Sequence, residues 1–230
     1  MSVKKEIIDE KKMLLILDNI YHKALEGIPK VSESVYDLAD DYLSKCTSKE
    51  DAAKSLIKNQ VIKCTTSGFL AGLGGLIVLP VALPVNVTSV LYVQLRMIAA
   101  IALIGGYDVN SDQVQTLSYV CLAGSGAADI LKNVGVKIGV KFAKAAIEKI
   151  PGKILIEINK KVGFRLITKF GTKGAINLVK AVPVAGGIVG GAMDYGSTKI
   201  IANNAYKIFI QNQLPQDNKN NVVDVDFVEK

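Results

Sequence analysis

The chain has 230 residues, half of them hydrophobic. It therefore has ample apolar surface to bury, which excludes a chain that is disordered throughout. It carries 28 basic and 21 acidic residues, a net charge of +7 at pH 7, and one segment supplies the excess. Residues 130–180 contain eleven lysines and one arginine against two glutamates, a balance of 12 − 2 = +10. Such a segment suits an anionic partner (acidic lipid, nucleic acid or acidic protein), although a solvated helix face has the same composition.

The cysteines and the N-terminus indicate a cytoplasmic protein. Three cysteines without a CxxC pair argue against a disulfide framework and indicate a reducing compartment. Because a zinc ion needs about four ligands and His22 is the single histidine, we expect no metal site. The N-terminal stretch mixes acids with its lysines and has only a short apolar run, unlike a secretory signal.

The N-terminal part of the chain is predicted to form three helices. Apolar residues recur at a period near 3.6 and predict a helix over Lys4–Leu25. Ser32 or Ser34 would begin a second helix, because a serine side chain can accept hydrogen bonds from the first free backbone amides. Ser48 with Asp51 three residues later forms a loose capping box for a third helix.

The next stretch, Cys64–Gln94, is uncharged for thirty-one residues. A helix that crosses a membrane needs about 20 apolar residues, so length alone would allow a span. However, Pro80 and Pro84 remove backbone donors and divide the apolar run into Cys64–Leu79 and Val85–Ala102. This division predicts a helical hairpin, either a soluble core element or a re-entrant insertion, rather than one straight span.

Further helices are predicted in the C-terminal half of the chain. Ser111 lies in a cap sequence, and Gly124-Ser125-Gly126 reads as a helix break. The predicted helices are Gln113–Gly124, Ala127–Ile150, Lys153–Val162, Phe164–Phe170, Lys173–Val182, and a last helix that follows Pro183 and ends near Ile210. The residues after about 212 form a polar tail.

The basic segment contains a pattern of lysines at helical spacing. Lys137, Lys141 and Lys144 would form one narrow polar stripe on an otherwise apolar helix. This is typical of a helix that lies on a membrane surface, and an ordinary surface helix of a bundle shows the same pattern. The basic character continues in the next two predicted helices. The candidate lipid-contacting residues are Lys137, Lys141, Lys144, Lys160, Lys161, Arg165 and Lys169.

No motif in the sequence indicates catalysis or a cofactor. The segment GLGGL lacks the third glycine of a dinucleotide-binding fingerprint, and GGIVGGAMD lacks the Gly-Lys-Ser/Thr of a phosphate-binding loop. Any triad would have to use His22, which no motif surrounds. The expectation is a non-enzymatic protein with no catalytic residues, cofactor or metal, while a hydrolase that uses carboxylates would leave no short signature.

Several polar residues lie in apolar surroundings, and a buried charge needs a partner. Arg96 is expected to pair with an aspartate, and Asp194 with Lys199 or a partner helix. These residues would either fix the register of the helices or bind a polar headgroup in an apolar cavity. The candidate buried polar residues are Gln94, Arg96, Asp129, Asp194 and Lys199.

Three stretches together resemble the EcsC family, which is named for the third product of a bacterial ABC-transporter operon. They are GFLAGLGGLIVLPVALPVNVTSVLYVQLRMIAAIALIGGYDVNSDQVQTL, IPGKILIEINKKVGFRLITKFG and VPVAGGIVGGAMDYGSTKIIANNAYKIF, and the similarity covers about Lys54 to Ile210. The resemblance implies an α-helical protein of bacterial type that associates with membranes. It implies no known reaction and no catalytic residues.

The combined prediction is an all-α, multi-helix bundle with a central apolar hairpin that contains glycine and proline. Residues 1–212 would form one domain, with N-terminal amphipathic helices over about 3–63, an EcsC-like core over about 54–210 and a flexible tail over 213–230. We expect a protein at the inner face of the cell membrane that binds anionic lipid through the basic segment and the hairpin.

The sequence leaves two alternatives open, and it argues against one partner. One alternative is a soluble module that binds lipid or another hydrophobe, or that serves a transporter or other membrane protein. The other is a pore-forming, toxin-like protein. Nucleic acid is disfavoured as a partner, because few aromatic residues interleave with the lysines and no known motif frames them.

Overall fold

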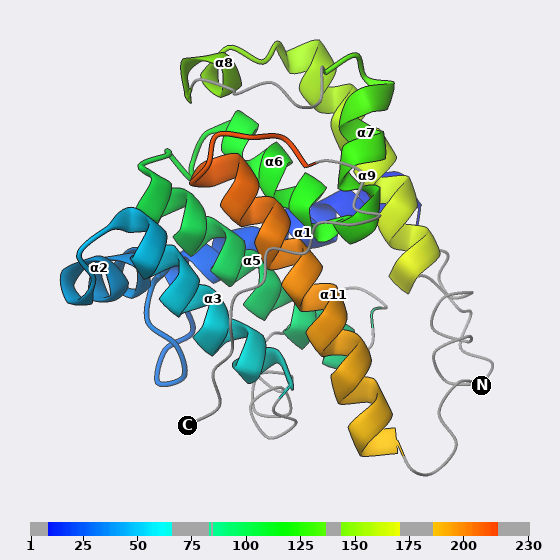
Figure 1. Ribbon diagram of the computed structural model, residues 1–230. Helices are drawn as coiled ribbons and strands as arrows, with labels where there is room; N and C mark the ends of the chain where they lie inside the picture. Colours follow the sequence, from blue (N-terminus) through cyan, green and yellow to red (C-terminus); the bar gives the residue numbers. More distant parts are fainter. Residues whose placement is uncertain (1–8, 66–82, 84, 137–143, 171–185, 216–230) are drawn as a thin grey trace.

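The computed structural model describes residues 9–65, 83, 85–136, 144–170 and 186–215, and these residues form an all-α protein without a strand (Figure 1). The predicted fold class, a multi-helix bundle, is confirmed. The helices of the described residues are α1 (Glu10–Glu26), α2 (Val35–Lys45), α3 (Lys49–Thr65), α5 (Val85–Gly105), α6 (Asp112–Leu122), the 3-10 turn η1 (Gly124–Gly126), α7 (Ala127–Asn133), α8 (Lys144–Glu148), α9 (Gly152–Phe170) and α11 (Gly186–Phe209).

The apolar helix α5 is the centre of the bundle. It packs against α1, α2, α3, α6 and α11. Within the described part of the chain, Val87–Gly105 is the one helical stretch long and apolar enough to cross a membrane, and 89% of it is buried inside the protein. The burial of α5 among the surrounding helices therefore accounts for its apolar composition. The preceding part of the predicted hairpin, residues 66–82, lies outside the described residues.

Most of the predicted helix starts are confirmed. Ser34 accepts a hydrogen bond from the Asp37 amide at 3.1 Å and caps α2. Ser48 Oγ accepts a hydrogen bond from the Asp51 backbone amide at 3.1 Å, as in a capping box, and it donates to Asp51 Oδ2 at 2.7 Å. Ser111 caps α6. The first helix begins later than predicted, at Glu10, because the extended residue Asp9 caps it.

The prediction of one helix over Ala127–Ile150 is wrong. Helix α7 ends at Asn133, and Gly135 follows with a φ of +80°, in the left-handed region that favours glycine. The Val136 amide then donates to the Leu131 carbonyl at 3.0 Å, which is the bonding pattern of a Schellman helix end. The next described helix, α8, begins only at Lys144.

The two short helices predicted on either side of Gly163 are in fact one continuous helix, α9. Gly163 is a packing residue rather than a break. A Cβ atom at this position would lie 3.3 Å from the Glu10 carbonyl oxygen and 3.4 Å from the Glu10 Cβ, so glycine allows α9 to approach the start of α1 closely.

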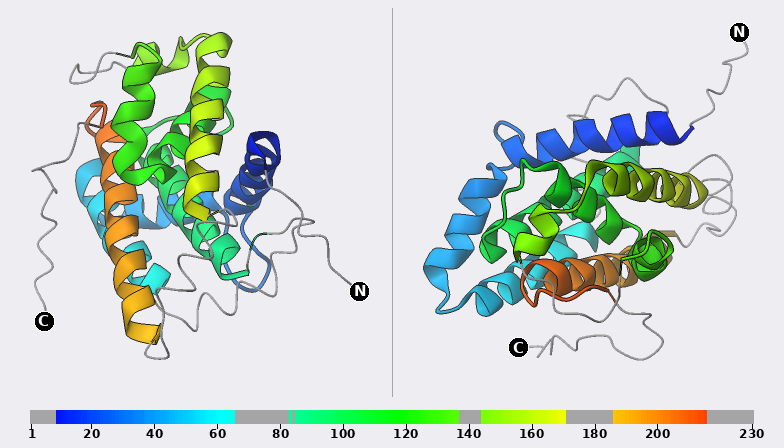
Figure 2. Two further views of the ribbon diagram at one scale, coloured as in Figure 1. Left: turned by 90° about the vertical axis from the view of Figure 1, so that its right-hand side faces the viewer. Right: turned by 90° about the horizontal axis from the view of Figure 1, so that it is seen from above.

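Helix α9 lies at the outside of the bundle. Figure 2 (left) shows it at the front, with α1 on one side and α7 and α11 on the other. It contacts α1, α6 and α7. The last helix, α11, packs against α3, α5 and α6 and against the turn η1. The predicted helix Lys173–Val182 and most of the predicted tail lie outside the described residues, so the division near residue 212 stays a prediction.

Candidate functional site

The outward side of α9 combines exposed apolar side chains with basic ones. Ile156, Lys160 and Phe164 follow one another at intervals of four residues, so they lie along one side of the helix. Ile156 and Phe164 are 59% and 61% exposed, and Lys153 and Lys160 are exposed beside them. These four residues are named the outer face. With five cations and one acid, α9 carries 5 − 1 = +4.

The opposite side of α9 holds the helix against the bundle. Leu155, Ile158, Val162 and Leu166 are buried, and they recur at the 3.6 period of an amphipathic helix. The close contact at Gly163 fixes the helix further. Because the inward side is anchored along its whole length, the exposure of Ile156 and Phe164 is a fixed property of the fold.

An open groove adjoins the outer face between α1, α6 and α9. It has a volume of about 630 Å³. Leu15, which is 61% exposed, and Ile156 are two of its apolar lining residues. Gln115 donates hydrogen bonds to Asp18 Oδ1 at 2.6 Å and to the Tyr119 hydroxyl at 2.8 Å. Burial raises the pKa of Tyr119 well above its ordinary value, so this hydroxyl stays neutral.

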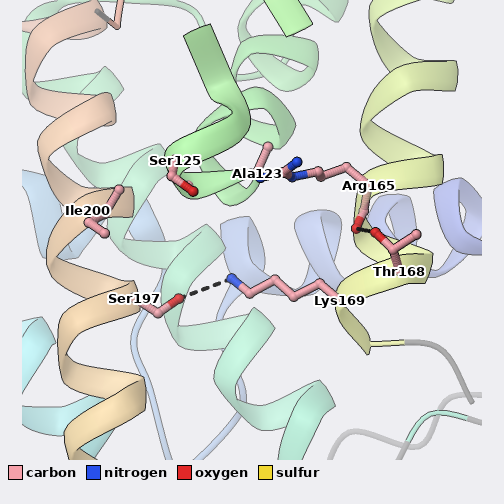
Figure 3. Close-up of a pocket in the computed structure, with 8 residues that line it drawn as sticks. Ala123, Ser125, Arg165, Thr168, Lys169, Ser197 and Ile200 are labelled. Atoms are coloured by element: carbon pink, nitrogen blue, oxygen red, sulfur yellow. Dashed lines mark hydrogen bonds between the residues drawn. The ribbon is translucent and has the colours of Figure 1, made fainter. Parts of the chain in front are cut away.

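A second hollow lies between η1, α9 and α11 (Figure 3). It has a volume of about 370 Å³. Lys169 extends from α9 across to α11, where its Nζ donates to Ser197 Oγ at 3.0 Å. The described lining residues include no carboxylate, and they are Ala123, Gly124, Ser125, Arg165, Thr168, Lys169, Ser197 and Ile200. We call this hollow the basic pocket.

The turn η1 is shaped to receive Arg165. A Cβ atom added to Gly126 would lie 2.6 Å from Arg165 Nε and 2.7 Å from Cζ, so the guanidinium occupies space that only glycine leaves open. Gly124 has a φ of +61°, and its carbonyl accepts a hydrogen bond from Nδ2 of the Asn204 side chain at 2.9 Å. The predicted break at Gly124–Gly126 is therefore a packed turn that joins α9 to α11.

The candidate lipid-contacting lysines and arginine separate into three groups. Lys160, Lys161, Arg165 and Lys169 share α9, and the last two line the basic pocket. Lys144 lies on α8, where it donates to the Gly106 carbonyl, approaches Glu148 to 3.9 Å and stands 5.6 Å from the Tyr107 ring centre. These contacts hold Lys144 against the end of α5. Lys137 and Lys141 lie outside the described residues.

The candidate buried polar residues also differ in their surroundings. Gln94 is buried and donates to Thr198 Oγ1 at 2.9 Å, which joins α5 to α11. Asp129 is exposed, so its predicted burial is wrong. Lys199 is half-buried and makes interactions of its own. The side chain of Asp194 lies outside the described part of the structure.

The prediction that Arg96 pairs with an aspartate is also wrong. Arg96 is buried, but its Nη2 donates to the Glu33 backbone carbonyl at 2.6 Å and lies 3.7 Å from the Glu33 carboxylate. No aspartate pairs with it in the described residues. The acceptors come instead from the segment immediately before α2, and α2 itself packs against α5. Arg96 thereby fixes α2 to the central helix.

Metal-ligating and nucleophilic side chains of the described residues have the following surroundings. They contain no group of three or more metal-ligating side chains. Burial raises the pKa of the Cys121 thiol far above its ordinary value, so the thiol is protonated and a poor nucleophile. His22 is exposed and lies 3.5 Å from Asp18, one helical turn away. The surface of α9 presents cations, hydroxyls and exposed apolar side chains.

Sequence reasoning missed the apolar half of this surface. Ile156, Phe164 and Leu15 were not singled out, and neither were the pocket hydroxyls of Ser125 and Ser197. The signal for the first two was present, because a helix that continues through Gly163 places Ile156, Lys160 and Phe164 on one side. The hydroxyls had no such signal, since they come from segments far apart in the sequence.

The comparisons with known proteins identify a family. The sequence profile of the EcsC protein family matches residues 3–211 of the 230. No curated protein matches the chain, and no solved structure does either. The match includes the three stretches on which the resemblance was based and extends to the N-terminal helices. The chain belongs to the EcsC protein family.

Proposed function

We propose that this is a non-enzymatic protein that binds the cytoplasmic face of a membrane rich in anionic lipid, through the outer face of α9. The observation that carries the proposal is the exposure of Phe164 and Ile156 on a helix of charge +4. Large apolar side chains gain free energy when they leave water, and nothing within the described residues covers these two. Lipid headgroups would surround the cations while the apolar side chains enter the interface.

The cations and the apolar side chains would act at different ranges. Each Lys or Arg near an anionic surface contributes about 1 kcal/mol, and this attraction falls off over about a Debye length. It would bring α9 to the membrane. Insertion of Phe164 and Ile156 would then hold it there. This differs from the sequence-based hypothesis in one respect: the described half of the apolar hairpin, α5, stays in the protein core.

The test is co-sedimentation with vesicles of graded anionic content, at low and at high salt. We expect binding that rises with anionic content and weakens steeply with salt, because the attraction is electrostatic. Lys160→Gln should weaken binding more than Lys58→Gln, which removes the same charge from an exposed site on α3. Equal binding to neutral and anionic vesicles, or equal effects of the two variants, would contradict the proposal.

A second candidate function, binding of a hydrophobe, is supported by the groove between α1, α6 and α9. Its volume of about 630 Å³ lies within the range of small-molecule sites. A lipid that co-purifies with the protein, detected by mass spectrometry, would support this function. Loss of that lipid on Leu15→Ser would place it in the groove, because Leu15 is an exposed lining residue.

A further inference from the structure

We propose that the groove between α1, α6 and α9 binds a neutral single-chain amphiphile, an alkyl chain whose uncharged head both donates and accepts hydrogen bonds, as in a monoacylglycerol. This inference rests on the second candidate function, binding of a hydrophobe, and it names the chemistry of the ligand. The described lining residues are Lys11, Leu14, Leu15, Asp18, Asp112, Gln115, Thr116, Tyr119, Gly152, Leu155, Ile156 and Asn159.

The walls of the groove are apolar and belong to two helices. Helices α1 and α9 pack side by side (Figure 2, right). Leu14 and Leu15 line the groove from α1, and Leu155 and Ile156 line it from α9. Because Leu15 and Ile156 are 61% and 59% exposed, an alkyl chain laid between them would remove apolar surface from water on both walls.

The size of the groove suits a single chain of medium length. Its lining residues on α9 run from Gly152 to Asn159, which is about 10 Å along the helix axis. The volume of about 630 Å³ is that of a small-molecule site. Probes with short alkyl chains, which stay soluble, therefore test this groove.

The floor of the groove is polar and comes mainly from α6. Thr116 and Tyr119 are buried there. The Thr116 hydroxyl accepts a hydrogen bond from Asn159 Nδ2 at 3.3 Å, and the Tyr119 hydroxyl accepts one from Gln115 Nε2 at 2.8 Å. Each hydroxyl therefore keeps its own hydrogen for donation to a ligand.

Asn159 adds an acceptor to the same floor. Its Oδ1 is buried and accepts no hydrogen bond within the described residues. A buried carbonyl without a donor costs free energy, and a ligand that brings a donor recovers it. The second hydrogen bond of Gln115, to Asp18 Oδ1 at 2.6 Å, holds the floor in place before a ligand arrives, which lowers the entropy lost on binding.

The charges of the groove disfavour a charged head. The described lining includes two acids, Asp18 and Asp112, and one exposed lysine, Lys11. A carboxylate head would meet the two acids, and it has no hydrogen to donate to Asn159 Oδ1. An ammonium head has no acceptor for the two hydroxyl hydrogens of the floor. A hydroxyl group both donates and accepts, so it serves the donors and the acceptor together.

The experiment is calorimetry at pH 7 with three probes that share one chain: monooctanoylglycerol, which is neutral, octanoate, which is anionic, and octylamine, which is cationic. The proteins are the wild type, Leu15→Ser, Tyr119→Phe and the matched control Tyr36→Phe, which removes the hydroxyl of an exposed side chain on α2. Tyr119→Phe keeps the ring that packs edge-on against Tyr21, so the fold is retained.

We expect monooctanoylglycerol to bind about tenfold or more tightly than either charged probe. Tyr119→Phe should weaken its binding about threefold to tenfold, because one hydrogen bond to the head is lost. Leu15→Ser should weaken the binding of all three probes, since it acts on the shared chain. Tyr36→Phe should leave the binding of all three unchanged.

The outcomes separate this inference from the functions proposed above. Equal binding of the three probes that Leu15→Ser weakens overturns the neutral head and leaves binding of a hydrophobe in place. Tighter binding of octanoate or octylamine, or equal effects of Tyr119→Phe and Tyr36→Phe, also overturns the neutral head. No binding of any probe overturns both. Phe164→Ser should leave probe binding unchanged, because Phe164 is not a described lining residue; loss of probe binding in this variant would place the probes on the outer face and overturn the groove.

Discussion

Replacement of Phe164 by serine should detach the protein from anionic membranes without unfolding it. Phe164 lies on the outer face of α9 and is 61% exposed. Its ring makes few contacts that the fold needs, while its exposed part is what would enter the membrane interface. Phe164→Ser leaves the charge of α9 unchanged, so the electrostatic attraction to anionic lipid is the same in both proteins.

The magnitude follows from the exposed part of the side chain. Complete burial of a phenylalanine side chain is worth about 1.5–3 kcal/mol. Since 61% of the side chain is still exposed, insertion into the membrane would gain about 1–2 kcal/mol by the same scale. This corresponds to a loss of about 5–30-fold in the partition coefficient of the variant.

Vesicle flotation at fixed anionic content measures this loss directly, and urea denaturation of the same samples measures the stability. The urea midpoint of Phe164→Ser should stay close to that of the wild type. Leu166→Ala is the matched control, because Leu166 is fully buried two positions along the same helix and its truncation should cost about 2–5 kcal/mol of stability. A partition coefficient of Phe164→Ser within twofold of the wild type would refute this reasoning.

Three further predictions concern the core. Arg96→Ala should lower the free energy of unfolding by about 2–5 kcal/mol in urea denaturation, because it leaves a cavity and an unpaired Glu33 carbonyl; a change below 1 kcal/mol would contradict this role. Gly105→Ala should lower the melting temperature of the protein, since its Cβ would overlap the Phe209 carbonyl oxygen. An unchanged melting temperature would show that α5 and α11 do not approach each other closely at these two residues. Cys121 in the folded protein should resist a thiol reagent at pH 8 and react only after denaturation, because burial raises the pKa of its thiol. Labelling is measured by mass spectrometry, with the Cys121→Ser variant as the control. Rapid labelling of Cys121 in the folded protein would contradict its burial.

The helix starts were predictable because the interactions that set them are local. The caps of α2, α3 and α6 join residues three positions apart in the chain, and serine spacing reveals such pairs directly. The prolines that divide the apolar run are equally local signals. The errors at Ala127–Ile150 and at Gly163 have the same source: a glycine can end a helix or allow two helices to pack closely, and only the neighbouring chain decides which.

The sequence by itself determined that this protein is all-α, that it contains a long apolar helix, and that its positive charge gathers in one segment. These properties follow from composition and from periodicity within one helix. The tertiary structure decided which surface that charge occupies. The pairing of Arg96 with Glu33 and the meeting of Arg165 with Ser125 and Ser197 both join segments that are distant in sequence. Such contacts are set by how the helices pack, and no spacing along the chain encodes them.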